Sequence, residues 1–195
     1  MNKTTNNLRK ITVTAVMAAL SSVLMFISFS VPFMPEFIKL DFSELPALIT
    51  AFAIGPFWGG AVCLIKNLVN LLFTHTAGIG ELSNFILGVL FVVPAGLIYK
   101  HRKTRATAIW GSVAGALIMA VVSIFTNYYI MYPIYSKIMP METIIGMYKA
   151  INPAVDTLWQ ALVFFNMPFT FFKGLCSVVV TMLIYKRISH IIKGK

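Results

Sequence analysis

Residues 81–105 read ELSNFILGVLFVVPAGLIYKHRKTR, an apolar run that ends abruptly in a basic cluster. As an α-helix the apolar part, 81–99, is about 28 Å long, which is close to the ~30 Å hydrocarbon core of a bilayer. The basic cluster at 100–105 is typical of a cytoplasmic loop, because Lys and Arg are retained on that side of a membrane. This stretch predicts a transmembrane helix that ends at the cytoplasmic surface.

The composition of the whole chain agrees with a membrane location. Of the 195 residues, 58% are hydrophobic and 11% are charged, which excludes an ordinary water-soluble domain. The net charge of +10 comes from short basic clusters beside apolar runs, so we expect topology signals and no nucleic acid partner. Cys63 and Cys176 lie inside apolar runs without metal-ligand spacing, and we expect them to pack. We predict one integral membrane domain over residues 1–195, surrounded by lipid and without a metal site.

Six apolar runs, bounded by charges or by Pro and Gly, follow one another along the chain. They cover residues 11–30, 42–55, 57–74, 81–99, 107–131 and 167–185. The second is only about 21 Å long as a helix, so we expect it to be tilted, sunken or re-entrant. Basic clusters at both chain ends match the one at 100–105, and all six acidic residues fall on the opposite side. The sequence therefore predicts an all-α membrane protein, a six-transmembrane-helix bundle with a short second span and both termini cytoplasmic.

Two helix starts carry capping signals. Asp41 and Glu44 have the spacing of a capping box that would open the second helix. Asn166 is expected to cap the sixth helix, after a long outer connection over residues 136–165. Lys173 would then lie about 8 to 10 Å from the outer end of that helix.

Polar side chains inside the spans are candidates for a binding site. A charge near the bilayer centre costs about 2.5 to 3.5 kcal/mol on insertion scales, so such residues are retained mainly for function. We expect the candidates at outer or middle depth to converge on one outward-facing pocket. They are Asp41, Ser43, Glu44, Lys66, Asn67, Asn70, Glu81, Asn84, Asn127 and Lys173.

These residues also have purely structural interpretations. Lys173 can extend to the outer lipid headgroups. Lys66 can pair with Glu44 or Glu81. The other candidates can cap a helix, hold an outer loop or bond to a neighbouring helix.

Small residues four apart occur near the cytoplasmic ends of two spans. Ala15 and Ala19 lie in the first span, and Gly111 and Gly115 lie in the fifth. This spacing lets helix backbones approach closely. It fits either packing inside the bundle or docking of another membrane subunit.

Motifs for catalysis are absent from the sequence. The chain has no phosphate-binding Walker A loop, no His-Glu-x-x-His zinc motif and no nucleophile elbow. We therefore expect no catalytic residues, no enzyme activity and no ATP hydrolysis by this chain.

Four stretches carry a family resemblance. They are LDFSELP at 40–46, LIKNL at 64–68, GELSNF at 80–85 and PFTFFKG at 168–174. With its size and six-span layout, the chain resembles the substrate-binding S components of energy-coupling factor (ECF) vitamin transporters, and most closely the riboflavin-specific ones.

The resemblance implies a function, partners and site residues. An S component binds a vitamin from outside the prokaryotic cell membrane and docks onto a transmembrane coupling subunit driven by two cytoplasmic ATPase subunits. Ala15 and Ala19 match the docking motif, and Lys173 and Asn127 correspond to ligands of the flavin ring. Thr170 stands where the riboflavin proteins place an asparagine, and it offers one hydroxyl in place of an amide. The implied ligand is riboflavin or a close flavin, carried as cargo and not as a cofactor.

Three other functions remain open at this stage. One is an S component for a different vitamin. Another is an autonomous secondary transporter that uses Lys66 and Glu81 as a proton relay. A membrane enzyme acting on lipid or isoprenoid is disfavoured, because the metal-binding and nucleophilic arrangements are missing.

Overall fold

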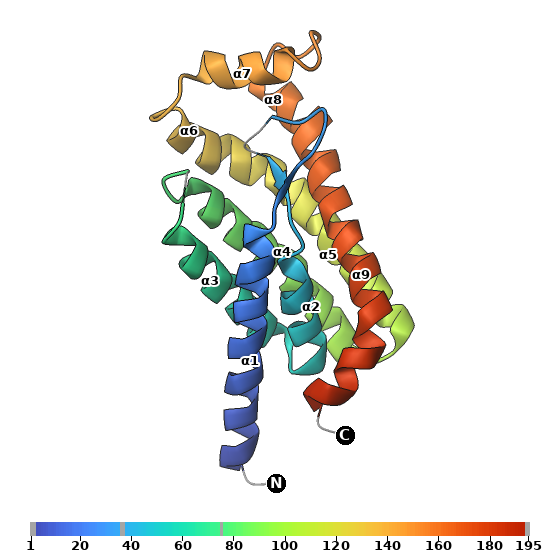
Figure 1. The fold of residues 1–195 in the computed structure, drawn as a ribbon. Helices are drawn as coiled ribbons and strands as arrows, with labels where there is room; N and C mark the ends of the chain where they lie inside the picture. Colours follow the sequence, from blue (N-terminus) through green and yellow to red (C-terminus); the bar gives the residue numbers. More distant parts are fainter. Residues whose placement is uncertain (1–2, 36–37, 75, 194–195) are drawn as a thin grey trace.

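Long apolar helices dominate the fold (Figure 1). The computed structural model describes residues 3–35, 38–74 and 76–193, and the side chains of residues 5–184 within those ranges. Four described helical stretches are long and apolar enough to cross a membrane: Thr5–Phe26, Ile79–His101, Arg105–Tyr135 and Leu158–Ile184. They correspond to the first, fourth, fifth and sixth predicted spans.

The helices are α1 (Lys3–Phe26), α2 (Glu44–Ala53), α3 (Pro56–Leu71), α4 (Ile79–His101), α5 (Arg105–Thr126), α6 (Tyr132–Tyr135), α7 (Met141–Lys149), α8 (Leu158–Ala161) and α9 (Met167–Lys193). Two π-helical segments, η1 (Asn127–Met131) and η2 (Leu162–Asn166), connect α5 to α6 and α8 to α9. Strands β1 (Phe29–Ser30) and β2 (Lys39–Leu40) pair antiparallel with Phe29 opposite Leu40. The sequence analysis did not predict this two-residue pairing.

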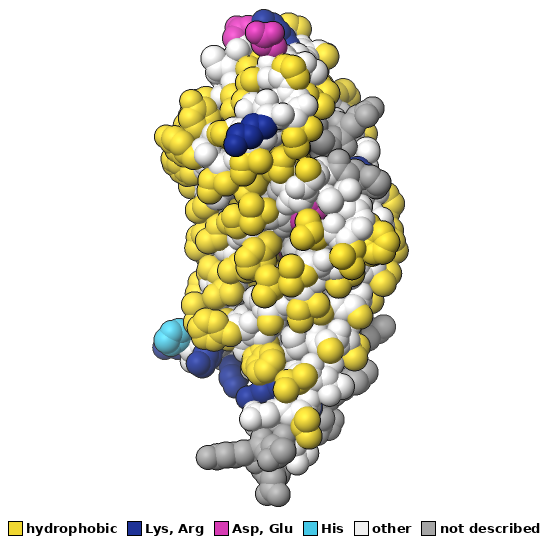
Figure 2. All heavy atoms as spheres, turned by 90° about the vertical axis from the view of Figure 1, so that its left-hand side faces the viewer, with side chains coloured by type: hydrophobic (Ala, Val, Ile, Leu, Met, Phe, Trp, Pro, Cys, Tyr) yellow, Lys and Arg dark blue, Asp and Glu magenta, His cyan; other side chains and the backbone are white. Residues whose placement is uncertain are grey.

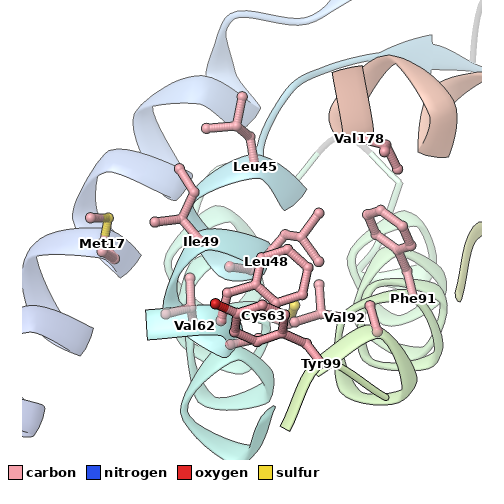
Figure 3. Packing of buried hydrophobic residues seen from close by; sticks show 14 of the residues in the cluster. Met17, Leu45, Leu48, Ile49, Val62, Cys63, Phe91, Val92, Tyr99 and Val178 are labelled. Carbon is pink, nitrogen blue, oxygen red and sulfur yellow. The ribbon is translucent and has the colours of Figure 1, made fainter. Parts of the chain in front are cut away.

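The short helix α2 is enclosed by the rest of the bundle. All of its residues from Glu44 to Phe52 are buried, and it packs against α1, α3, α4 and α9. In Figure 3, Leu48 and Ile49 of α2 lie between Met17 of α1 and Phe91 of α4. A helix that is apolar all round is stable when it is covered on all sides. At about 15 Å α2 is shorter than the hydrocarbon core of a bilayer, and the surrounding helices bury it.

Glycines allow α4 and α5 to pack closely. A Cβ atom on Gly115 would lie 2.3 Å from the carbonyl oxygen of Phe91, and one on Gly111 would lie 3.0 Å from the α4 backbone. The Gly111 and Gly115 pair therefore packs inside the bundle. Ala15 and Ala19 of α1 are exposed, so the other small-residue pair lies on the outer surface.

The last candidate membrane helix, predicted over 167–185, begins at Leu158, earlier than predicted. Thr157 caps it, because the Thr157 side chain accepts from the Gln160 N–H and the Gln160 side chain accepts from the Thr157 N–H. Asn166 lies inside the helix as the last residue of η2, so its prediction as a cap was wrong. Lys173 is consequently about 22 Å along the helix from its start, and not 8 to 10 Å.

Both π segments stand directly before a proline. η1 ends at Met131, two residues before Pro133, and η2 ends at Asn166, two residues before Pro168. Proline lacks an N–H group, and its ring clashes with the carbonyl one α-helical turn earlier. The wider π turn accommodates the ring, so both helices continue through their prolines.

The surface has an apolar band between polar ends. Figure 2 shows hydrophobic side chains over the middle of one face, with acidic and a few basic side chains toward one end and a basic cluster toward the other. Both described chain ends lie at the same end of the bundle as the exposed basic connection 101–105 between α4 and α5 (Figure 1). The basic side chains beyond residue 184 lie outside the described part. A band of this kind is the surface of an integral membrane protein.

Candidate ligand-binding site

Four charged side chains, here called the ion cluster, meet inside the bundle: Asp41, Glu44, Lys66 and Lys173. The Lys66 Nζ atom lies 2.8 Å from Glu44 Oε1, and the Lys173 Nζ atom lies 2.8 Å from Asp41 Oδ2. Lys173 Nζ also lies 3.6 Å from Glu44 Oε2. The cluster joins the start of α2 to α3 and α9. Its two positive and two negative charges balance, which lowers the cost of burying each of them.

Ser43 lies at the centre of the ion cluster and is fully buried. Its hydroxyl contacts the carboxylate of Asp41 and the ammonium of Lys66, and its backbone N–H donates to Asp41 Oδ1 at 2.9 Å. Its carbonyl oxygen accepts from the Ser21 hydroxyl of α1. Ser43 is the N-cap residue of α2 and makes no side-chain capping bond. The predicted capping box is wrong, because the Glu44 side chain turns to Lys66 instead.

Asn84 and Glu81 of α4 have different partners. Asn84 Oδ1 lies 3.5 Å from Lys66 Nζ, at the edge of the ion cluster. Glu81 Oε2 accepts from the hydroxyls of Thr74, at 2.9 Å, and Thr76, at 3.1 Å. Glu81 therefore orders the connection between α3 and α4, and Lys66 has its carboxylate partner elsewhere.

Asn127 and Thr170 are buried, with 8% exposure each, and no side-chain hydrogen bond joins either of them to the described residues. Asn127 begins η1 at the end of α5, and Thr170 lies on α9, which packs against α5. Their polar atoms are not among the fully buried atoms that lack a partner in the described residues, so they are not sealed off inside the packing. These two side chains have donors and acceptors available for a ligand.

A second polar cluster was not predicted from the sequence. We call it the tyrosine cluster, and it comprises Tyr132, Tyr148 and Asn166. The Tyr148 hydroxyl donates to Asn166 Oδ1 at 2.7 Å and lies 2.5 Å from the Tyr132 hydroxyl. Burial raises the pKa of Tyr148, so its hydroxyl remains neutral. The cluster ties α7 to α6 and η2.

The sequence contained one signal for the tyrosine cluster. Asn166 lies four residues before Thr170 and seven before Lys173, so all three share one helix face. Asn127 and Asn166 also bound the two π segments, and π-helical turns are frequent at functional sites. The buried polar groups of these segments therefore gather where η1 follows α5 and where η2 leads into α9.

The fold and this polar interior define an integral membrane protein with a candidate ligand site inside its helical bundle. The described residues contain no group of three or more potential metal ligands. The sequence model of the ECF transporter substrate-specific component matches residues 9–185. The chain belongs to this family, and it is a transporter component and not an enzyme.

Individual relatives cover nearly the whole chain. The riboflavin transporter RibU of Staphylococcus aureus is 33% identical over 96% of this chain and 93% of its own. The riboflavin transporter FmnP of Bacillus subtilis is 29% identical over 91% of this chain and 90% of its own. The solved structure of the S component of a bacterial ECF transporter is 30% identical, with a TM-score of 0.76, and covers 96% of this chain and 99% of its own. The predicted family resemblance is confirmed.

Proposed function

We propose that this chain is the riboflavin-binding S component of an ECF transporter. The observation that carries the proposal is its similarity to riboflavin transporters over nearly the full length of both proteins. The protein captures riboflavin or a close flavin outside a prokaryotic cell membrane. It then delivers the flavin through a transmembrane coupling subunit driven by two cytoplasmic ATPase subunits.

The chemistry of the buried side chains supports a flavin ligand. The pyrimidine edge of the flavin ring has carbonyl acceptors and an N–H donor. The Asn127 amide, the Thr170 hydroxyl and the Lys173 ammonium supply matching groups, and we assign these three to the ring. The fused rings also need apolar walls. Phe169 and Phe172 of α9 line an apolar groove with Phe33, but Phe33 and Phe172 are exposed and none of the three polar residues lines this groove, so we do not assign it to the ring.

The other candidate residues support the site from around it. Asp41, Ser43 and Lys66 hold the ion cluster together, with Asn84 at its edge, and Glu81 orders the connection before α4. This arrangement favours a binding subunit over a proton-coupled transporter. A relay from Lys66 to Glu81 would need these side chains to exchange a proton, yet each is bonded to other groups.

We further propose six membrane segments, with α2 and α3 as the second and third. Both termini and the 101–105 connection then face the cytoplasm, and α7 faces the outside. A variant with Cys63 and Cys176 replaced by Ala provides the background for labelling. A membrane-impermeant maleimide on intact cells should label an Asp156→Cys variant and leave an Arg102→Cys variant unlabelled. Labelling of both variants from outside would contradict this topology.

The exposed Ala15 and Ala19 on α1 are proposed to contact the coupling subunit. Leucine at both positions should block ATP-driven uptake by steric interference and leave riboflavin binding to the isolated chain unchanged. Leucine at the exposed Ala150 of the outer connection is the matched control. Normal uptake by the Ala15→Leu/Ala19→Leu variant would contradict the proposed contact of these residues with the coupling subunit.

The ring assignments are tested by titrating riboflavin with detergent-purified protein and following the quenching of flavin fluorescence. Asn127→Ala and Thr170→Ala should each weaken binding by about 5- to 100-fold, because a hydrogen bond to the ring is lost. Asn7→Ala, on the exposed cytoplasmic end of α1, should bind like the wild type. Unchanged affinity in both site variants would show that these residues do not contact the ligand.

A further inference from the structure

The two lysines of the ion cluster use their hydrogen-bonding capacity differently. A lysine ammonium has three N–H donors. Three acceptors surround Lys66 Nζ: Ser43 Oγ, Glu44 Oε1 at 2.8 Å and Asn84 Oδ1 at 3.5 Å. All donors of Lys66 are therefore occupied, and its side chain is fully buried. Lys66 therefore has no N–H donor available for a ligand.

Lys173 retains at least one donor. Its acceptors among the described residues are Asp41 Oδ2 at 2.8 Å and Glu44 Oε2 at 3.6 Å. Its side chain is 14% exposed, whereas that of Lys66 has 0% exposure. Lys173 therefore lies at the border of the ion cluster, with one N–H available to an acceptor outside it.

Asp41 is bonded through both of its carboxylate oxygens. Oδ1 accepts from the backbone N–H of Ser43 at 2.9 Å and from the Ser43 hydroxyl, and Oδ2 accepts from Lys173. These bonds fix the carboxylate at the start of α2, and Asp41 is only 5% exposed. Asp41 is thus placed to act on Lys173 and not on a ligand directly.

We propose that Asp41 is a positioning residue, which holds the Lys173 ammonium so that its remaining N–H points to an acceptor on the ligand. Lys66 and Glu44 form the inner part of the ion cluster, which anchors α3 to α2 and does not contact the ligand. The inference rests on the proposed function, and the acceptor is then a carbonyl oxygen or ring nitrogen of the flavin. Asp41 and Lys173 connect segments 132 residues apart, so the pair also sets α9 relative to α2.

A double-mutant cycle on purified protein tests this role, with riboflavin as the probe. Asp41→Asn should weaken riboflavin binding by about 10-fold or more, and Lys173→Met should weaken it at least as much. In the Lys173→Met background, Asp41→Asn should have no further effect, because Asp41 acts through Lys173. In the wild-type background, Asp41→Asn should change the visible absorption spectrum of bound riboflavin. In the Lys173→Met background, Asp41→Asn should leave that spectrum unchanged.

The control is Asp156→Asn, which breaks an exposed ion pair with Lys149 and lies away from the ion cluster. It should alter neither affinity nor spectrum. If Asp41→Asn does not yield folded protein, Asp41→Glu keeps the charge and completes the same cycle. Equal losses of affinity from the Asp41 substitution in both backgrounds would overturn the inference. Absence of riboflavin binding to the wild type would instead overturn the proposed function, and this inference with it.

Discussion

Replacing Lys66 by Met removes the most deeply buried charge of the ion cluster. Methionine is of similar length, so the space stays filled while the ammonium is lost. Glu44 then loses its partner at 2.8 Å and keeps the Ser43 hydroxyl at 3.4 Å and the Lys173 ammonium at 3.6 Å, although it is itself only 3% exposed. The cluster would hold two negative charges and one positive charge in the interior of the bundle.

The expected loss of stability follows from this imbalance. Breaking a buried ion pair by removing one partner costs about 3 to 5 kcal/mol, since the remaining charge is left uncompensated. For a chain of this length, 1 kcal/mol corresponds to about 2 to 4 °C in Tm. Lys66→Met should therefore unfold about 6 to 20 °C below the wild type.

A second substitution distinguishes loss of charge balance from loss of packing. Adding Glu44→Gln to Lys66→Met leaves one negative and one positive charge, Asp41 and Lys173, which restores neutrality. The double variant should recover most of the lost stability, because replacing both members of a buried pair is often neutral. Lys149→Met breaks an exposed ion pair and serves as the control, with an expected change of about 0 to 1 kcal/mol.

The assay is thermal unfolding of detergent-purified protein, followed by intrinsic tryptophan fluorescence. Two results would refute the reasoning. One is a Tm for Lys66→Met equal to that of the wild type. The other is a double variant that is as unstable as the single one, which would mean that packing and not charge balance holds this part of the bundle.

Two further predictions concern helix packing. Gly115→Ala should destabilise the protein by about 1 to 3 kcal/mol, because its Cβ would lie 2.3 Å from the Phe91 carbonyl oxygen. Gly146→Ala on α7 meets nothing within 4 Å and should stabilise by up to about 1 kcal/mol, so the two unfolding midpoints should move in opposite directions. Tyr148→Phe leaves Asn166 Oδ1 without its donor at 2.7 Å and should cost about 1 to 3 kcal/mol. Limited proteolysis should then cut near α7 faster than in the wild type, and an unchanged rate would contradict the role of the tyrosine cluster.

The long helices could be predicted from the sequence because their signal is local. An apolar run of suitable length followed by a basic cluster, as at 81–105, indicates both the helix and its end. The short run at 42–55 was recognised as unusual from its length alone. Four other helices cover α2 on all sides. This burial depends on contacts between distant segments, so it cannot be predicted from the sequence of α2 alone.

The start of the last long helix shows where local signals compete. Thr157 and Gln160 have the spacing of a capping box, but Asn166 gave a second start signal ahead of Pro168. The π turn η2 lets the helix pass through that proline, and the sequence rules do not anticipate it. The tyrosine cluster was missed for the same reason, since Asn166 was interpreted as a cap.

The members of the ion cluster were predictable as a set but not as pairs. Charged residues within apolar runs must find partners, and this requirement selected Lys66 and Lys173, whereas Asp41 was selected as a start signal of the short second helix. The sequence offers two carboxylate partners for Lys66, Glu44 and Glu81. Only the three-dimensional structure shows that Lys66 pairs with Glu44. The same holds for Glu81, which is bonded to the preceding connection instead.

Selective vitamin binding by the wild-type chain tests the central claim most directly. The purified protein would be equilibrated in detergent with riboflavin, thiamine, biotin or folate in turn, and the bound amount determined by equilibrium dialysis. We predict one riboflavin per chain and no saturable binding of the other three. Saturable binding of another vitamin, with none of riboflavin, would contradict the assignment of this polar interior to a flavin.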